Sequence, residues 1–182
     1  MANREIAILA AKHALANVGV QEETGNNDGK YIEMYQQSCE PPIGKHGPWC
    51  AGFIVYRYTQ AALYLEQDMP DDYPKTGWCP SFSRWAKKNG LWTPAMSCVQ
   101  DSDNVRVGDQ CLFYFKTLGR VAHTGIVVEL DSRNRGVWTV EGNTSPEPSD
   151  YSTVERDGDG VYKKWRTWGE FGQFGGFARI DF

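Results

Sequence analysis

Cys50 stands where a loop containing proline and glycine gives way to an apolar helical pattern, in the stretch HGPWCAGFIVY. The N-terminus of a helix offers free N–H groups and a partial positive charge, which favour a thiolate and can stabilise an oxyanion. Ala51 and Gly52 are small and leave room for a substrate beside the sulfur. The pattern fits a catalytic nucleophile, and it fits a buried structural cysteine equally well.

A cysteine nucleophile needs a base, which is normally a histidine, and the chain has three of them. His13 lies within an expected helix, and His46 lies in the loop before Cys50, where a solvated side chain is the simpler interpretation. His123 opens the β-rich run HTGIVVEL, with small residues around it. A histidine at the mouth of a strand can face a cleft, so His123 is the candidate base.

Glu141 and Asn143 are two residues apart in GVWTVEGNT, which places them on the same face of an extended strand. The short turn DSRNRG separates this run from HTGIVVEL and favours an antiparallel hairpin. Pairing about that turn brings Glu141 and Asn143 near His123 and offers either a carboxylate or an amide to hold one ring nitrogen. Taken alone, Glu141 fits a solvated strand edge and Asn143 fits a turn. Together with His123 they indicate a catalytic set.

The remaining pattern places helices before strands. Helices are expected over residues 3–18, 30–38, 50–65 and 81–90. The later β-rich runs are QCLFYF, HTGIVVEL, GVWTVEG, GVYKKW and GFARIDF. No repeat or linker divides the chain. We therefore expect one α+β domain over residues 1–182, with N-terminal helices packed on a C-terminal antiparallel sheet.

Composition limits the function classes. The chain has 182 residues, of which 41% are hydrophobic and 23% charged, as in globular proteins. Its net charge of −4 argues against a nucleic-acid partner, and no run approaches the ~20 apolar residues of a membrane span. Lys12 and His13 interrupt the first apolar stretch, which favours an amphipathic helix over a signal peptide. We expect a monomer that is made in the cytoplasm.

None of the five cysteines forms a CxxC pair, which argues against a zinc knuckle. Without a signal peptide the reduced state is the default. Cys111 is most simply a buried strand residue, whereas free thiols and one loop disulfide are both open for Cys39, Cys79 and Cys98. The acid-rich loops TGNND, DSDN and RDGDG do not complete a calcium-loop spacing and are interpreted as turns. No metal or other cofactor is expected.

Five stretches, PWCAGFIVY, GDQCLFYF, HTGIVVE, VEGNT and DGDGVYKKW, resemble in order the motifs of CHAP domains, the cysteine- and histidine-dependent amidohydrolases/peptidases. The earlier stretch GVQEETGNNDGKYIEMY resembles the N-terminal part of phage and bacterial members, so the likeness extends from Gly19 to the C-terminus. The resemblance implies a papain-like α+β fold with Cys50 as nucleophile, His123 as base and Glu141 as the polar residue that orients it. Asn143 would be an accessory.

The resemblance also implies a substrate, an amide bond in bacterial peptidoglycan peptide, cleaved at the cell wall or periplasm after release or delivery. Trp49 fills the place where the related NlpC-type hydrolases usually have aspartate, and we assign Trp49 and Asn143 to substrate binding. Amidase and endopeptidase activity are both open, as are a phage lysin, a tail-associated hydrolase and a delivered toxin. Some CHAP domains carry calcium, so a bound calcium ion is also open. The alternatives are a catalytically silent CHAP-like module that binds wall peptide or belongs to a phage particle, and an amidase for small soluble amides.

Overall fold

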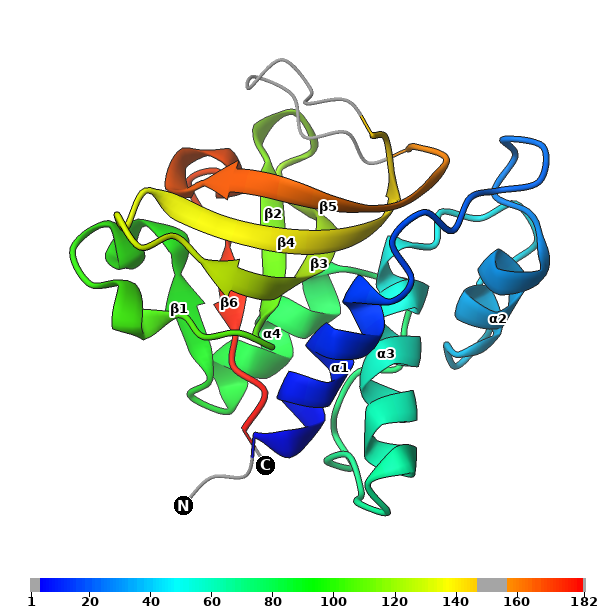
Figure 1. The fold of residues 1–182 in the computed structure, drawn as a ribbon, viewed down its shortest axis with the longest axis horizontal. Helices are drawn as coiled ribbons and strands as arrows, with labels where there is room; N and C mark the ends of the chain where they lie inside the picture. The colour runs from blue at the N-terminus through cyan, green and yellow to red at the C-terminus, as the bar shows by residue number, and fades with distance from the viewer. Residues whose placement is uncertain (1–3, 147–156, 182) are drawn as a thin grey trace.

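The computed structural model describes residues 4–146 and 157–181. Figure 1 shows an antiparallel sheet with three helices against one face, while a fourth helix lies beyond them, away from the sheet. The helices are α1 (Glu5–Leu15), α2 (Lys30–Gln37), α3 (Cys50–Tyr64) and α4 (Pro80–Lys88). The strands are β1 (Trp92–Pro94), β2 (Gln110–Phe115), β3 (Arg120–Leu130), β4 (Gly136–Thr144), β5 (Gly160–Thr167) and β6 (Gly176–Ala178).

The prediction of an α+β fold is confirmed, with N-terminal helices packed on a six-stranded antiparallel sheet of order β1-β6-β2-β3-β4-β5. All four expected helices and all five expected strands are present, with ends that differ by a few residues. Strand β1 was not predicted, because three residues that include a proline are too few to show an alternating pattern. It pairs with β6 at the edge of the sheet.

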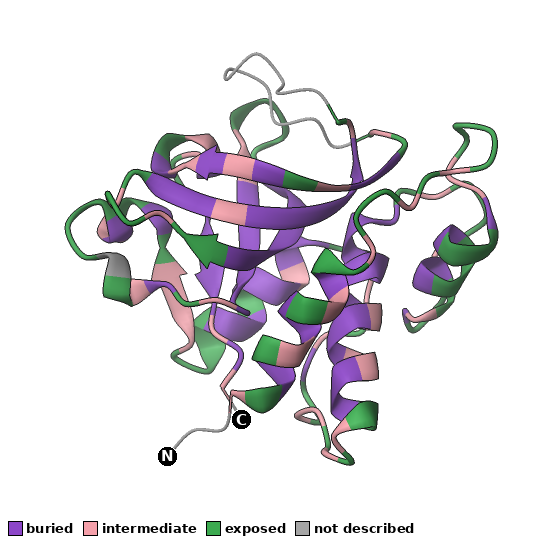
Figure 2. Ribbon diagram, in the orientation of Figure 1, coloured by how far each residue is buried: buried purple, intermediate pink, exposed green. Residues whose placement is uncertain are grey.

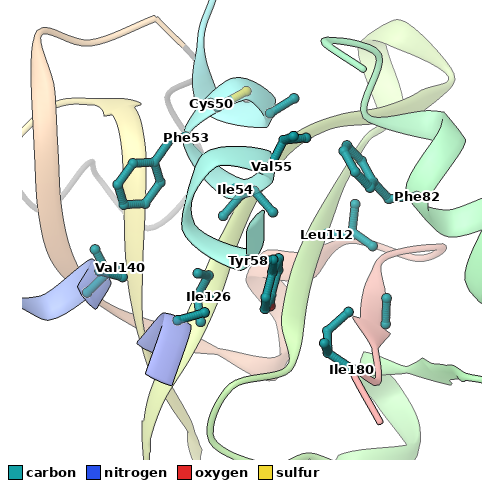
Figure 3. Close-up of a cluster of buried hydrophobic side chains, with 14 of the residues drawn as sticks. Cys50, Phe53, Ile54, Val55, Tyr58, Phe82, Leu112, Ile126, Val140 and Ile180 are labelled. Carbon is teal, nitrogen blue, oxygen red and sulfur yellow. The ribbon is translucent and has the colours of Figure 1, made fainter. Parts of the chain in front are cut away.

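The sheet carries apolar side chains on both faces. On the helix side, Ile54 and Tyr58 of α3 pack with Ile126 of β3 and Val140 of β4, and Cys50 stands at the start of the same helix (Figure 3). On the other face a second cluster is covered by two 3-10 turns, at Ala95–Val99 and Trp168–Phe171, and contains Cys111, Phe113, Val127, Val137 and Phe177. Because both faces are covered, β3 and β4 are buried along most of their length (Figure 2).

Gly52 serves helix packing. A Cβ atom at this position would lie 2.5 Å from the carbonyl oxygen of Tyr35, so the missing side chain is what lets α2 approach α3. Ala51 is also fully buried. The expectation that Ala51 and Gly52 leave room for a substrate is therefore wrong, because the space beside them is filled by protein.

In the part of the chain that the structure describes, no helix is both long enough and apolar enough to cross a bilayer.

Candidate active site

His123 on β3 and Glu141 on β4 form a fully buried pair. The hairpin aligns Gly125 with Glu141, which places Glu141 opposite the middle of β3 and near His123. Nε2 of His123 lies 2.8 Å from Oε2 of Glu141, and neither side chain is exposed. The predicted hairpin is thus confirmed, and of the two candidates for holding the imidazole it is the carboxylate that does so.

Arg166 on β5 is a member of this cluster that the sequence reasoning missed. Its Nε and Nη2 atoms donate to the two carboxylate oxygens of Glu141 over 2.8 and 2.7 Å, a bidentate pair buried in the sheet. Thr139 donates its hydroxyl to Oε1 of Glu141 over 2.6 Å, and Nη1 of Arg166 reaches Glu170. The sequence feature that could have indicated this contact is an arginine at an inward-facing position of the GVYKKWRT strand, because a buried arginine requires an acidic partner.

These contacts fix the charge states. Burial alone would raise the pKa of Glu141, but Arg166 and His123 together hold that pKa well below its usual range. Burial would likewise lower the pKa of His123, whereas the nearby Cys50 sulfur and the Glu141 carboxylate raise it to about 9. Glu141 is therefore an anion and His123 an imidazolium at neutral pH, and each charge has an opposite charge beside it.

Cys50 is the first residue of α3, as predicted, and is 4% exposed. The hydrogen bond from Cys79 is the largest influence on the Cys50 thiol; with His123 and the backbone N–H of Ala51 it outweighs burial and lowers the Cys50 pKa well below its ordinary value. Nδ1 of His123 has no hydrogen-bond partner among the described residues. Since Nε2 is held by Glu141, Nδ1 is the nitrogen that can exchange a proton with Cys50 or with a reacting group.

Cys79 is the second residue that the sequence reasoning did not place at the site. Its sulfur lies 3.9 Å from that of Cys50, and it immediately precedes α4 as Cys50 opens α3. The hydrogen bond with Cys50 and burial raise the pKa of Cys79 well above its ordinary value, so Cys79 keeps its proton and donates it toward Cys50. The Trp-Cys dipeptide occurs at both positions, Trp49-Cys50 and Trp78-Cys79. This repetition was the sequence feature that could have linked Cys79 to Cys50.

Asn143 and Trp49 meet at the start of α3, where both are closed off from solvent. Oδ1 of Asn143 accepts from the backbone N–H of Trp49 over 2.7 Å, and the indole of Trp49 donates to Glu22 over 2.8 Å and stacks on Tyr35. Both side chains are fully buried. Their burial therefore argues against the expected substrate contact, and their hydrogen bonds instead hold the backbone that leads into Cys50.

The expectation that Asn143 shares a face with Glu141 is also wrong. Pairing with β5 shifts between Glu141 and Thr144, and Asn143 has a φ of 57°. This left-handed residue breaks the alternation of the strand. Its side chain consequently points to Trp49 and to the carbonyl of Gly158, while Glu141 points to His123.

The other two histidines have different surroundings. His13 on α1 is beside Arg57, and burial and that positive charge lower its pKa. His46 contacts the carbonyl oxygen of Asn26 and lines a cavity of about 690 Å³. The cavity touches the site through Glu22, whose carboxylate holds Trp49, and through Gly158, which bonds Asn143; Cys50 and His123 do not line it.

The remaining thiols are unpaired, and no cysteine is disulfide-bonded in the structure. Cys111 is a fully buried strand residue, as predicted; it lies on the second face of the sheet, and burial raises its pKa well above the ordinary value. Burial also raises the pKa of Cys39 and of Cys98 to about 11 in each case. Over residues 4–146 and 157–181, no group of three or more His, Cys, Asp or Glu side chains is arranged to hold a metal ion.

Comparison with known proteins gives no relative: no family model, no curated protein and no solved structure matches the chain.

Proposed function

We propose that this chain is a cysteine-dependent amidohydrolase that cleaves an amide bond in bacterial peptidoglycan peptide. One observation carries the proposal. A cysteine with a strongly lowered pKa opens a helix beside a histidine whose far nitrogen is held by a buried carboxylate. Nucleophile, base and orienting group are the three parts that thiol catalysis of acyl transfer requires.

The reaction follows from these positions. The Cys50 thiolate attacks the carbonyl carbon of the scissile amide, and N–H groups in the first turn of α3, which have no intrahelical acceptor, stabilise the oxyanion. Nδ1 of the His123 imidazolium gives its proton to the leaving amine. The neutral imidazole then takes a proton from water, which hydrolyses the thioester and restores the thiolate. Glu141 holds the ring throughout and stabilises its imidazolium form, and Arg166 keeps Glu141 ionised.

The choice of peptidoglycan rests on the order of the CHAP-like motifs along the chain, from the Cys50 helix through the His123 and Glu141 strands. The cavity of about 690 Å³ next to the Trp49 loop adds a polar surface on which an extended wall peptide could lie. Amidase and endopeptidase action use the same chemistry, and the bond is assigned by the products.

One observation favours the alternative of a catalytically silent module. Cys50 is only 4% exposed and His123 is fully buried, so a substrate carbonyl must gain access before the thiolate can attack it. A wall-binding or phage structural module would need no such opening.

Digestion of purified peptidoglycan separates these functions. We expect the wild-type protein to solubilise the wall, and mass spectrometry of the fragments to show either free lactyl groups with intact stem peptides (amidase) or shortened peptides (endopeptidase). Binding to the wall without release of any fragment, under conditions where Cys50 is reduced, would support the silent module instead. Hydrolysis of short soluble amides without clearing of the wall would identify a small-molecule amidase.

A further inference from the structure

Cys79 has no step in the proposed hydrolysis, yet its sulfur is the only one within hydrogen-bond distance of the Cys50 sulfur among the described residues. We propose that Cys50 and Cys79 are a peroxide-sensitive pair, in which Cys50 is oxidised first and Cys79 then closes a reversible disulfide. The disulfide itself does not depend on the proposed function; only its effect on hydrolysis does.

The geometry favours this pair over any other. The two sulfurs are 3.9 Å apart, and a disulfide requires about 2 Å, so they need to approach by roughly 2 Å. Each thiol stands at the start of a helix of at least nine residues, with Pro80 as the first residue of α4. The bond would thus join the starts of α3 and α4 and leave the strands untouched.

All five cysteines are buried, but Cys50 and Cys79 each keep a small exposed fraction. Cys50 and Cys79 are each 4% exposed, whereas Cys39 is 1% exposed and Cys98 and Cys111 are fully enclosed. Hydrogen peroxide is close to water in size, so a small opening suffices for it. Reaction with peroxide also requires a thiolate, which the surroundings of Cys50 favour through His123 and the start of α3.

The two steps balance. The Cys50 thiolate attacks one peroxide oxygen, the O–O bond breaks, and the departing hydroxide takes the proton of the His123 imidazolium to leave as water, which gives Cys50 sulfenic acid. The Cys79 sulfur then attacks the Cys50 sulfur, the S–O bond breaks, and the hydroxide leaves with the Cys79 proton as a second water. Two thiols are oxidised to a disulfide and one peroxide is reduced to two waters. A dithiol reverses the bond by exchange.

The consequence is protection of Cys50. A sulfenic acid without a neighbouring thiol proceeds to sulfinic acid, which is not reversed by dithiols. With the Cys79 sulfur 3.9 Å away, the sulfenic acid has a thiol beside it with which to form the disulfide. Oxidation then holds the Cys50 sulfur in a disulfide that dithiols can reduce. While the disulfide is present, Cys50 cannot act as a nucleophile.

Peptide mapping of the native protein tests the pair. The protein is treated with hydrogen peroxide at neutral pH, alkylated with iodoacetamide, digested and analysed by mass spectrometry. We expect a Cys50–Cys79 linked peptide, lighter by two hydrogens (about 2 Da), and full return of Cys50 alkylation after dithiothreitol. Linkage of Cys50 to Cys39, or oxidised Cys50 beside a Cys79 that still alkylates, would overturn the proposal.

Two serine variants sharpen the result. In Cys79→Ser, peroxide should convert Cys50 to a sulfenic acid that dimedone traps and then to sulfinic acid, with loss of the recovery by dithiothreitol. Cys98→Ser is the matched control, because Cys98 is fully buried in the other core cluster, and it should behave as wild type. Full recovery in Cys79→Ser would contradict the role of Cys79. If Cys79→Ser does not fold, the linkage found in the wild-type protein decides the matter.

The same samples keep this proposal distinct from the hydrolase. A linked Cys50–Cys79 peptide in a protein that releases nothing from peptidoglycan would support the redox pair and count against the proposed function. Wall cleavage that continues in a protein with no linkage after peroxide would do the reverse.

Discussion

Nε2 of His123 lies 2.8 Å from Oε2 of Glu141, and both side chains are completely enclosed by the sheet. This contact settles which imidazole nitrogen is free. Because Glu141 also receives two hydrogen bonds from Arg166, it stays ionised and fixes the ring, so Nδ1 alone is left to serve Cys50.

Replacement of Glu141 by glutamine tests that contact. Glu141→Gln keeps the size and some hydrogen bonding but removes the charge that stabilises the imidazolium, and it leaves the buried Arg166 with only Glu170 as a counter-ion. We expect kcat to fall by roughly 10²–10⁴ and the free energy of unfolding by about 3–5 kcal/mol, as measured by wall hydrolysis and urea titration. Glu129→Gln on the same sheet removes only an exposed pair with Lys163 and should change neither quantity. An unchanged kcat in Glu141→Gln would show that the charge is not used.

The pH dependence of kcat/KM has a defined sign. The reactive form is the Cys50 thiolate with the His123 imidazolium, and the pKa of His123 is raised to about 9 by its neighbours. Activity should therefore decline as the pH rises through about 9, and decline again at acid pH where the pair takes up a proton. In Glu141→Gln the midpoint of the alkaline limb should shift to lower pH, toward the pKa of a free histidine, ~6.5. An alkaline limb that stays in place would contradict the link between Glu141 and His123.

Alkylation rates should separate Cys50 from the other four thiols. A thiolate reacts with iodoacetamide and a thiol does not, so Cys50 should be labelled first at neutral pH, well below the ~8.5 of free cysteine. Cys79 should follow slowly, because the hydrogen bond with Cys50 and burial raise its pKa. Cys98 and Cys111 are fully enclosed and should be labelled only after unfolding. Equal labelling of all five in native protein would favour a structural thiol at position 50.

Asn143 is expected to act through Trp49. Asn143→Ala removes the oxygen that accepts the Trp49 N–H. It also places alanine, which disfavours the left-handed region, at a backbone φ of 57°. Together these changes should lower the free energy of unfolding by about 2–4 kcal/mol. The start of α3 would be less well held, so kcat should fall while KM stays nearly constant. Asn143→Asp keeps the acceptor and tolerates the left-handed backbone, and it should restore most of the kcat. A change confined to KM would return Asn143 to the substrate-contacting role first expected of it.

The sequence was sufficient to predict contacts that depend on local pattern. The turn at DSRNRG sets the register of β3 and β4, so the meeting of His123 and Glu141 could be predicted from spacing alone. The start of α3 at Cys50 followed from apolar periodicity.

Contacts between distant elements could not be predicted in this way. Arg166 reaches Glu141 through the register of β5 on β4, which no short turn fixes, and Cys79 meets Cys50 only because the starts of two helices converge. Burial of Trp49 and the β-bulge at Asn143 depend on the same tertiary packing, and both argue against the substrate contact that residue type had suggested.

The release of amino groups from purified peptidoglycan, compared between wild type, Cys50→Ala and Cys98→Ala, tests the central claim most directly. Cys98 is a fully buried cysteine outside the site, so Cys98→Ala controls for the loss of a thiol. We expect wild type and Cys98→Ala to release wall fragments at similar rates, and Cys50→Ala to release none while its far-ultraviolet circular dichroism is unchanged. Release by folded Cys50→Ala at the wild-type rate would contradict the account.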